Sequence, residues 1–470
     1  MFEVPVSSRP AKRLRTMVGD EAGARYDDLI VEARKRLRDR CVWHINATVE
    51  GGGVAEILSA NLGYLADDGI PTRWLVIEAE PTFFEITKRI HNRLHGVLGD
   101  GGPLGDAERR HYGSTSAREL EALRSFVRPG DVVVVHDPQP LGLVPGLREI
   151  GATVVWTCHV GVDIATDIVR SAWSFLREDL RAAQAATFTR RAYVWDGLEA
   201  LALRTIPPCI DPLSAKNVAL SGSDIPRILG SAGIFDPPPG QPGSAACTED
   251  GRAIIRHEAQ MTERARTPPD APLVLQVSRW DALKDPVGVM IGFARSVRTD
   301  AHLILAGPAP SSVVDDPEAD HVFTEVRQAW LGLDERARTR VHLANLPIED
   351  PEENAVVVNA LQSRADVVVQ KSMAEGFGLT VTEAMWKARP VVAGGVGGIR
   401  EQIDDGVNGV LVDPRDLGAF GSAVTDLLQD PERAASLGAE GRRSVQERFL
   451  PTRYLADYLG LFLELIGKTS

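Results

Sequence analysis

Short, continuous runs of apolar residues recur along both halves of this 470-residue chain, and each is followed by a turn and a helical pattern. Apolar runs that do not alternate with polar residues are typical of parallel strands buried on both faces. Strand-then-helix order gives right-handed βαβ units, so we expect an α/β fold of two doubly wound, Rossmann-like domains facing a central cleft. The predicted strands are residues 41–46, 73–77, 131–136, 153–159, 272–278, 302–307, 366–370 and 390–394.

Two proline-rich stretches mark the boundary between the halves. Residues 206–217 contain the sequence IPPCIDP, and residues 235–251 are a Pro/Gly/Ser stretch in which we expect no regular structure. The last helix, 453–467, is apolar most of the way round and therefore needs burial, for which we expect it to cross back onto the first domain. The predicted divisions are an N-terminal domain 1–214, a C-terminal domain 215–452 with an exposed insertion at 235–268, and a final helical segment 453–470.

Charge and composition narrow the functional classes. A net charge of −13 argues against nucleic-acid binding, which needs a basic surface, but it allows a local basic site for one nucleotide. The four cysteines form no C-x-x-C motif or His/Cys cluster, which fits a reduced cytoplasmic protein without disulfides or structural zinc. No window approaches the ~18 apolar residues of a membrane helix. The basic segment 31–40 lacks bulky aromatic residues, so we interpret it as a solvated helix face rather than a membrane-surface helix.

A glycine-rich turn follows the first predicted strand and opens the next helix. Gly51, Gly52 and Gly53 carry no side chains, so a ligand can approach the backbone closely, and the helix N-terminus behind them favours an anion. The turn does not match the G-x-G-x-x-G motif of dinucleotide binding. A phosphate or sugar contact and a purely structural turn therefore both remain open.

Two His/Asp pairs also follow strand ends in the first half. They are His136 with Asp137 and His159 with Asp163. Ligands of open α/β sheets bind at the carboxyl ends of the strands, so these side chains are candidates to line the cleft. A structural role for each histidine is the alternative, and zinc ligation lacks the usual ligand spacing.

In the second half, Arg279 and Lys284 come directly after a predicted strand. Two cations five residues apart in one loop suit a diphosphate, because arginine can bind it through two hydrogen bonds and lysine adds a point charge. A pair of solvated surface charges is the alternative interpretation of the same residues.

The segment 371–390 places one glutamate on each side of a predicted helix start. The Gly-Phe-Gly turn 376–378 interrupts the helical pattern, which then runs over 379–387. The turn amides and the helix N-terminus suit an anion such as a diphosphate. Glu375 and Glu383 would then accept hydrogen bonds from sugar and ribose hydroxyls on the two sides of that diphosphate. The pattern therefore indicates a nucleotide sugar as the ligand. The alternative is that Glu375 only caps the helix and Glu383 is only a surface residue of it.

These motifs resemble those of a known enzyme family. Arg279, Lys284 and EGFGLTVTE, whose two glutamates are eight residues apart, are similar to the retaining glycosyltransferases of family GT4, which have the GT-B fold. The segments WHINATVEGGGVAEIL, HDPQPLGL, IPPCIDPLSAKN and QVSRWDALKDPVGV narrow the resemblance to the trehalose glycosyltransferring synthases. The likeness runs through most of residues 20–460, apart from the insertion.

The resemblance implies transfer of glucose from a nucleoside-diphosphate-glucose to free glucose, giving trehalose with retention of configuration. It implies catalytic roles for Arg279, Lys284, Glu375 and His159. The implied donor-binding residues are Gly52, Gly53, Arg279, Lys284, Glu375, Gly376, Phe377, Gly378, Leu379, Thr380 and Glu383. The implied acceptor-side residues are Asp137, His159 and Asp163. No cofactor is implied beyond the donor, and no metal ion, because Arg279 and Lys284 take its place.

Two departures from the family pattern concern the acceptor. The chain has Thr157 where the family has an arginine, and His159 to Asp163 is longer than the family's H-I-D. Another sugar or an aminocyclitol-type acceptor therefore stays open, as does a trehalose phosphorylase that uses phosphate or glucose 1-phosphate.

Two other classes explain fewer of the motifs. A non-catalytic sensor of nucleotide sugars would not need both glutamates and both cations. An NAD-dependent oxidoreductase would leave the second-half site unexplained. The sequence does not specify the donor base or the oligomeric state, for which a homodimer is one option.

Overall fold

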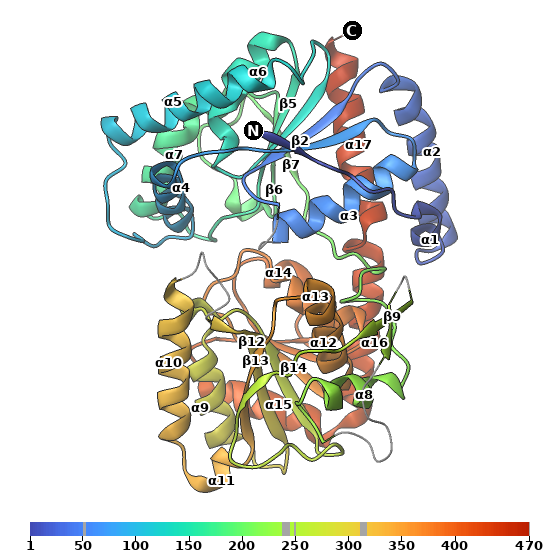
Figure 1. Cartoon of the computed structure of the whole chain (residues 1–470), viewed down its shortest axis with the longest axis vertical. Helices are drawn as coiled ribbons and strands as arrows, with labels where there is room; N and C mark the ends of the chain where they lie inside the picture. The colour runs from blue at the N-terminus through green and yellow to red at the C-terminus, as the bar shows by residue number, and fades with distance from the viewer. Residues whose placement is uncertain (50–52, 237–244, 249–250, 311–316, 470) are drawn as a thin grey trace. The chain divides into compact units, whose positions relative to one another are not determined.

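The computed structural model divides the chain into two compact units, shown in Figure 1. The N-terminal unit is Met1–Asp211 with Phe449–Ser470, and the C-terminal unit is Pro212–Arg448. The structure describes residues 1–49, 53–236, 245–248, 251–310 and 317–469. Each unit contains a seven-stranded sheet, parallel except at one edge, with helices connecting its strands. This confirms the predicted α/β fold with two doubly wound sheets.

The sheet of the N-terminal unit has the order β1-β3-β2-β4-β5-β6-β7, with β1 antiparallel to β3 and the other neighbours parallel. Its strands are β1 (Phe2–Val4), β2 (Val42–Asn46), β3 (Thr72–Val76), β4 (Val132–His136), β5 (Thr153–Cys158), β6 (Ala185–Phe188) and β7 (Ala202–Thr205). Its α-helices are α1 (Ala11–Arg15), α2 (Asp20–Arg36), α3 (Gly53–Asp67), α4 (Pro81–Leu94), α5 (Asp106–Leu123), α6 (Val144–Ile150), α7 (Asp167–Leu180) and α17 (Pro451–Thr469).

The core of this unit follows from its sequence pattern. Every residue of β2, β4, β5 and β6 is buried, as expected for parallel strands covered on both faces. The C-terminal helix α17 packs beside α2 and α3, and its buried side chains include Tyr458 and Phe462 (Figure 1). The Tyr458 hydroxyl group is 2.9 Å from Oγ1 of Thr157 on β5. The end of the chain is therefore a structural part of the N-terminal unit.

The sheet of the C-terminal unit has the order β10-β13-β12-β11-β14-β15-β16, with β10 antiparallel to β13. Its strands are β10 (Gln260–Thr262), β11 (Leu273–Val277), β12 (His302–Pro308), β13 (Val341–Leu346), β14 (Val367–Gln370), β15 (Val391–Gly394) and β16 (Val410–Val412). Its α-helices are α8 (Asp224–Ser231), α9 (Pro286–Ser296), α10 (Pro317–Leu331), α11 (Glu335–Arg338), α12 (Pro351–Arg364), α13 (Leu379–Trp386), α14 (Ile399–Gln402), α15 (Leu417–Gln429) and α16 (Pro431–Arg448).

The prediction for residues 235–251 was wrong in part. Strand β8 (Ala245–Thr248) pairs antiparallel with β9 (Gly251–Ile254), so the stretch contains regular structure where we expected none. Backbone hydrogen bonds between two short strands do not require an alternating apolar pattern, and the Pro/Gly composition therefore did not reveal them. Among the described residues, no helix is both long and apolar enough to cross a membrane.

Candidate active site

In the C-terminal unit, the loop that carries Arg279 and Lys284 and the loop that carries Glu375 follow two neighbouring strands of the sheet. Strands β11 and β14 are neighbours in the sheet, and the chain order reverses between them. Such a switch point is where open α/β sheets bind ligands, beyond the carboxyl ends of the strands. Arg279 follows β11 and Glu375 follows β14, so the fold places both at this point.

Three contacts join these two loops. The amide of Met373 donates a hydrogen bond to the carbonyl of Leu283, at 2.7 Å. The fully buried Lys371 forms an ion pair with Asp285, and its Nζ donates to the carbonyl of Pro414 at 2.6 Å. The third contact is the ion pair between Lys284 and Glu375. These contacts fix the two loops against each other, which is the preorganisation that a binding site needs.

Lys284 and Glu375 form the centre of the candidate site. Lys284 Nζ lies 2.5 Å from Glu375 Oε2, and the two side chains are only 17% and 9% exposed. Ser372 Oγ also donates to Glu375 Oε2, at 3.2 Å, and itself accepts a hydrogen bond from Gln370 at 2.9 Å. A lysine aimed at this edge can neutralise a phosphate, and a carboxylate beside it can accept hydrogen bonds from sugar hydroxyls.

The Gly-Phe-Gly turn adopts the conformation that its glycines allow. Gly378 has φ +88°, in the left-handed region, and stands at the N-cap of α13. Gln402 Nε2 donates to the carbonyl of Phe377 at 2.5 Å, and the amide of Gly398 donates to the carbonyl of Glu375 at 3.1 Å. These two hydrogen bonds hold the carbonyl groups of Glu375 and Phe377 and so fix the turn at the start of α13. The N-terminus of this helix favours an anion.

Gly398 packs directly against this turn. A Cβ atom added at Gly398 would lie 2.4 Å from the carbonyl oxygen of Gly376 and 2.4 Å from Cα of Phe377. We therefore expect Gly398→Ala to displace the turn and to lower the unfolding free energy by about 1–3 kcal/mol. Thermal melts and titration with a nucleoside diphosphate would measure both effects. Gly222→Ala is the control, since nothing lies within 4 Å of its Cβ position, and equal effects from both substitutions would contradict this account.

Glu383 lies deeper than the turn, on α13. Glu383 is only 2% exposed, and Nζ of Lys216 lies 3.5 Å from Oε1 of its carboxylate. Gln362 Nε2 lies 3.5 Å from the other oxygen of the same carboxylate. Leu379 and Thr380 occupy the first turn of the same helix, where Oγ1 of Thr380 donates to Gln370 at 3.4 Å. A carboxylate at this position offers two oxygen atoms that can accept hydrogen bonds from a ribose.

Lys387 lies next to Glu383 and anchors the segment that carries Lys216. Its Nζ donates to Oδ1 of Asn217 at 3.0 Å and to the carbonyl of Glu383 at 3.3 Å. The indole of Trp386 donates to the carbonyl of Asn217 at 3.0 Å. Burial lowers the pKa of Lys387 to about 7, against a smaller raising effect of Glu383.

The lowered pKa of Lys387 predicts a pH dependence of stability. Its ordinary value is 10.5, so between about pH 7 and pH 10.5 the unfolded chain binds a proton that the folded chain lacks. Stability therefore rises with pH across this window, by at most about 1.4 kcal/mol per pH unit for this group. Melts of Lys387→Met at pH 7 to 9 should lack this part of the slope. The exposed-lysine variant Lys35→Met should keep it, and an unchanged slope in Lys387→Met would contradict the prediction.

Arg279 is placed differently from Lys284. Its side chain is 56% exposed, and its guanidinium lies 3.3 Å from Oδ2 of Asp281. Arg279 therefore lies at the solvent-exposed edge of the candidate site, whereas Lys284 is mostly buried. This position suits a group that reaches a ligand from solvent.

The predicted residues of the N-terminal unit also gather at a switch point, between β2 and β4. Gly53 begins α3, whereas Gly52 lies outside the described residues. Asp137, just after β4, has φ +63°, and its Oδ1 accepts a hydrogen bond from the backbone amide of His159 at 2.8 Å. Burial raises the pKa of the Asp137 carboxyl group. The structure thus brings Asp137 and His159 together.

Two other residues of this region have definite partners. Asp163 forms an ion pair with Arg190, whose side chain is 12% exposed. Thr157 is buried, and its Oγ1 accepts from the hydroxyl of Thr187 at 2.9 Å besides its contact with Tyr458. Whether this departure from the family pattern changes the acceptor stays a prediction for Thr157. Its side chain contributes to packing beneath α17, because the alternation of β5 directs it toward that helix.

Sequence reasoning missed several residues of the candidate site. Lys216 and Asn217 belong to the IPPCIDPLSAKN segment, which supported the resemblance but received no role. Lys371 and Ser372 follow directly on β14, and this position was the available signal for them. Gln402 supports the turn from α14, and nothing in the local sequence pattern indicated it.

Comparison with known proteins agrees with the geometry. Residues 259–444 match the family described as "Glycosyl transferases group 1". An α,α-trehalose-phosphate synthase (UDP-forming) from Burkholderia vietnamiensis superposes with a TM-score of 0.66 at 13% identity, covering 92% of this chain and 98% of that one. Two doubly wound sheets with a polar site at the switch point thus define a glycosyltransferase of the GT-B fold.

Relatives with higher sequence identity identify the family. Residues 44–195 match "Trehalose synthase, N-terminal domain". A trehalose synthase of Rubrobacter xylanophilus is 38% identical over 93% of this chain and 93% of its own. A trehalose phosphorylase of Pleurotus pulmonarius is 24% identical over 87% of this chain but only 55% of its own length. The chain belongs to the trehalose synthase family of glycosyltransferases, which confirms the resemblance found in its sequence.

Proposed function

We propose that this enzyme transfers glucose from a nucleoside-diphosphate-glucose to free glucose and forms trehalose with retention of configuration. The observation that carries the proposal is the pair Lys284–Glu375 at the switch point of the second sheet, with Glu383 buried behind it. Lys284 supplies a cation for phosphate, and Glu375 and Glu383 supply carboxylates for hydroxyl groups, as a nucleotide sugar requires. The name of the 38% identical relative, trehalose synthase, supports the choice of product.

The donor is assigned to the C-terminal unit. Lys284 and Arg279 would neutralise the diphosphate, and the amides of the 376–378 turn would contact it or the sugar. Glu375 would then exchange its ion pair with Lys284 for hydroxyl groups of the donor glucose. Glu383, held by Lys216, would accept hydrogen bonds from the ribose.

The acceptor is assigned to Asp137, His159 and Asp163 of the N-terminal unit. In a front-face mechanism the acceptor hydroxyl attacks the anomeric carbon from the side that the nucleoside diphosphate leaves. The departing phosphate oxygen takes the proton of that hydroxyl, so no protein nucleophile is needed. The residues contribute position and stabilisation of the charge on the leaving group. Because Lys284 and Arg279 supply positive charge at that group, we propose that transfer needs no metal ion.

A donor panel tests this proposal. The enzyme would be incubated with free glucose and UDP-, ADP-, GDP- or dTDP-glucose in the presence of EDTA, and the sugars separated by chromatography. Trehalose with at least one donor is expected. Trehalose formed from glucose 1-phosphate but from none of the four donors would identify a phosphorylase instead. Nucleotide release with glucose left unchanged would retain the donor assignment and overturn the acceptor.

A further inference from the structure

Three histidines of the N-terminal unit form a continuous chain of hydrogen bonds. They come from three neighbouring strands: His44 from β2, His136 from the end of β4, and His159 from just after β5. Nδ1 of His44 lies 3.0 Å from Nε2 of His136, and Nδ1 of His136 lies 3.2 Å from Nε2 of His159. Both pairs of rings are stacked, with interplanar angles of 22° and 10°. The chain therefore runs from the core of the unit to the carboxyl end of its sheet.

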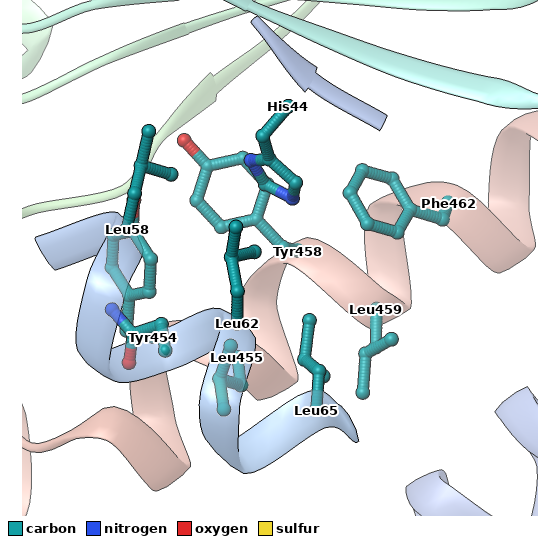
Figure 2. Close-up of a pocket in the computed structure, with 10 residues that line it drawn as sticks. His44, Leu58, Leu62, Leu65, Tyr454, Leu455, Tyr458, Leu459 and Phe462 are labelled. Atoms are coloured by element: carbon teal, nitrogen blue, oxygen red, sulfur yellow. The ribbon is translucent and has the colours of Figure 1, made fainter. Parts of the chain in front are cut away.

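The inner end of the chain meets a small apolar cavity. Nε2 of His44 is buried, and it has no hydrogen-bond partner among the residues that the structure describes. Figure 2 shows the His44 ring at the cavity, among leucines of α3 and aromatic side chains of α17 that include Leu62 and Tyr458. The cavity measures about 10 Å³, the lower limit for one water molecule. Most of its lining is apolar, and no described atom accepts a hydrogen bond from the inner nitrogen.

Proton counting leaves two states for such a chain. Burial lowers the pKa of His44 to about 3 and also lowers those of His136 and His159, so all three rings are neutral. Three neutral rings carry three N–H groups, and two of them lie in the two hydrogen bonds. The third N–H is either at Nε2 of His44 or at Nδ1 of His159. Because each hydrogen bond needs one donor and one acceptor, the tautomers of the three rings change only together.

The outer end of the histidine chain favours the second state. At the inner end, Nε2 of His44 lacks a partner among the described residues in both states, as an N–H group or as an acceptor, so this end does not decide between them. At the outer end, the Asp137 carboxylate accepts from the backbone amide of His159 at 2.8 Å, and its negative charge favours a protonated ring nitrogen on His159. We propose that His44 and His136 are positioning residues that fix His159 as its Nδ1–H tautomer, with a hydrogen-bond donor at the end of the sheet.

This arrangement gives His159 a definite use, which rests on the proposed function. A neutral imidazole with an N–H group pointing outward donates to a sugar oxygen and cannot serve as a general base through that nitrogen. Its partner would be a hydroxyl or ring oxygen of a hexose. This fits a reaction in which the leaving phosphate, and not the protein, accepts the proton.

Nitrogen-15 NMR of histidine-labelled enzyme tests the tautomers without any sugar. Protonated and unprotonated ring nitrogens have separate signals, and a His159→Gln variant identifies those of His159. In the wild-type protein at pH 7.5 we expect all three rings in the Nδ1–H form. Signals of His159 in the Nε2–H form, or averaged between the two forms, would overturn the proposal.

One variant then tests the link between the rings. His136→Phe keeps a flat ring in the stack but removes the hydrogen bond to Nε2 of His159, so the separate His159 signals should merge toward an average of both tautomers. His302→Phe is the matched control, because His302 and His342 form a similar stacked pair, 2.9 Å between nitrogens, in the C-terminal unit. A His159 tautomer that persists in His136→Phe would contradict the proposal. If His136→Phe does not fold, the wild-type spectrum decides alone.

The two proposals fail independently. The spectra require neither donor nor acceptor, so an unexpected tautomer leaves the transfer of glucose standing. Absence of trehalose in the donor panel would in turn leave the histidine chain standing as a structural finding.

Discussion

Replacement of Lys284 by methionine is expected to lower the turnover of nucleotide sugar by roughly 10²-fold or more, because a preorganised charge at a leaving group contributes most in the transition state. Methionine keeps the length and the apolar stem of lysine, so the loop can retain its packing. The loss of charge also leaves Glu375, whose side chain is 9% exposed, without its nearest cation. Steady-state kinetics with saturating donor would show the effect in kcat.

A matched surface pair provides the control for this experiment. Lys468 forms an ion pair of 2.7 Å with Glu464 on α17, but its side chain is 65% exposed. Exposed pairs contribute little to stability, so Lys468→Met should have the kinetics of the wild type. If Lys284→Met folds and turns over as fast as Lys468→Met, Lys284 does not act on the leaving group.

Replacement of Glu383 by glutamine is expected to weaken the binding of a nucleoside diphosphate by about 10- to 100-fold. Glutamine preserves the shape of the side chain but loses a charged hydrogen-bond acceptor, and hydrogen bonds to charged groups contribute about 1.5–3 kcal/mol. The Lys216 ammonium group, 3.5 Å from the carboxylate, also loses its charge partner. Isothermal titration calorimetry would measure the dissociation constant.

The 2′-deoxy form of the same nucleotide makes this test specific for the ribose. It should bind the wild type less tightly than the ribonucleotide, whereas Glu383→Gln should bind both forms alike, because the hydroxyl has lost its partner in each case. The exposed-glutamate variant Glu447→Gln, 58% exposed on α16, should behave as the wild type. Undiminished discrimination in Glu383→Gln would place the ribose elsewhere.

Much of the fold could be predicted because buried parallel strands have a strong local signal. The run VVVVH of β4 and the run LVLQV of β11 are each apolar except for one polar residue, and both precede helices. The edge strands β1 and β10 have only three residues each, and their antiparallel pairing depends on the partner strand. β8 and β9 were missed for a similar reason, since backbone pairing defines them and their composition is typical of loops.

The candidate site was predictable only where the residues follow strand ends. Lys284 and Glu375 were assigned to one ligand from their positions after two predicted strands, and the structure places them 2.5 Å apart. Lys216 contacts Glu383 from a segment far away in the sequence, so no local spacing could reveal the pair. A resemblance gives the position of Thr157 in the sequence but not the face of the strand on which its side chain lies. The described structure shows that this face packs beneath α17.

Transfer to isotopically labelled glucose would show whether this enzyme joins the donor glucose to free glucose. The enzyme would receive a nucleoside-diphosphate-glucose and free glucose labelled with carbon-13 at C1, with EDTA present, and the product would be followed by NMR. We predict that the label enters one anomeric carbon of α,α-trehalose while the donor is consumed. Label that remains in free glucose during donor consumption, or a product with a β linkage, would contradict the proposed retaining synthesis of trehalose.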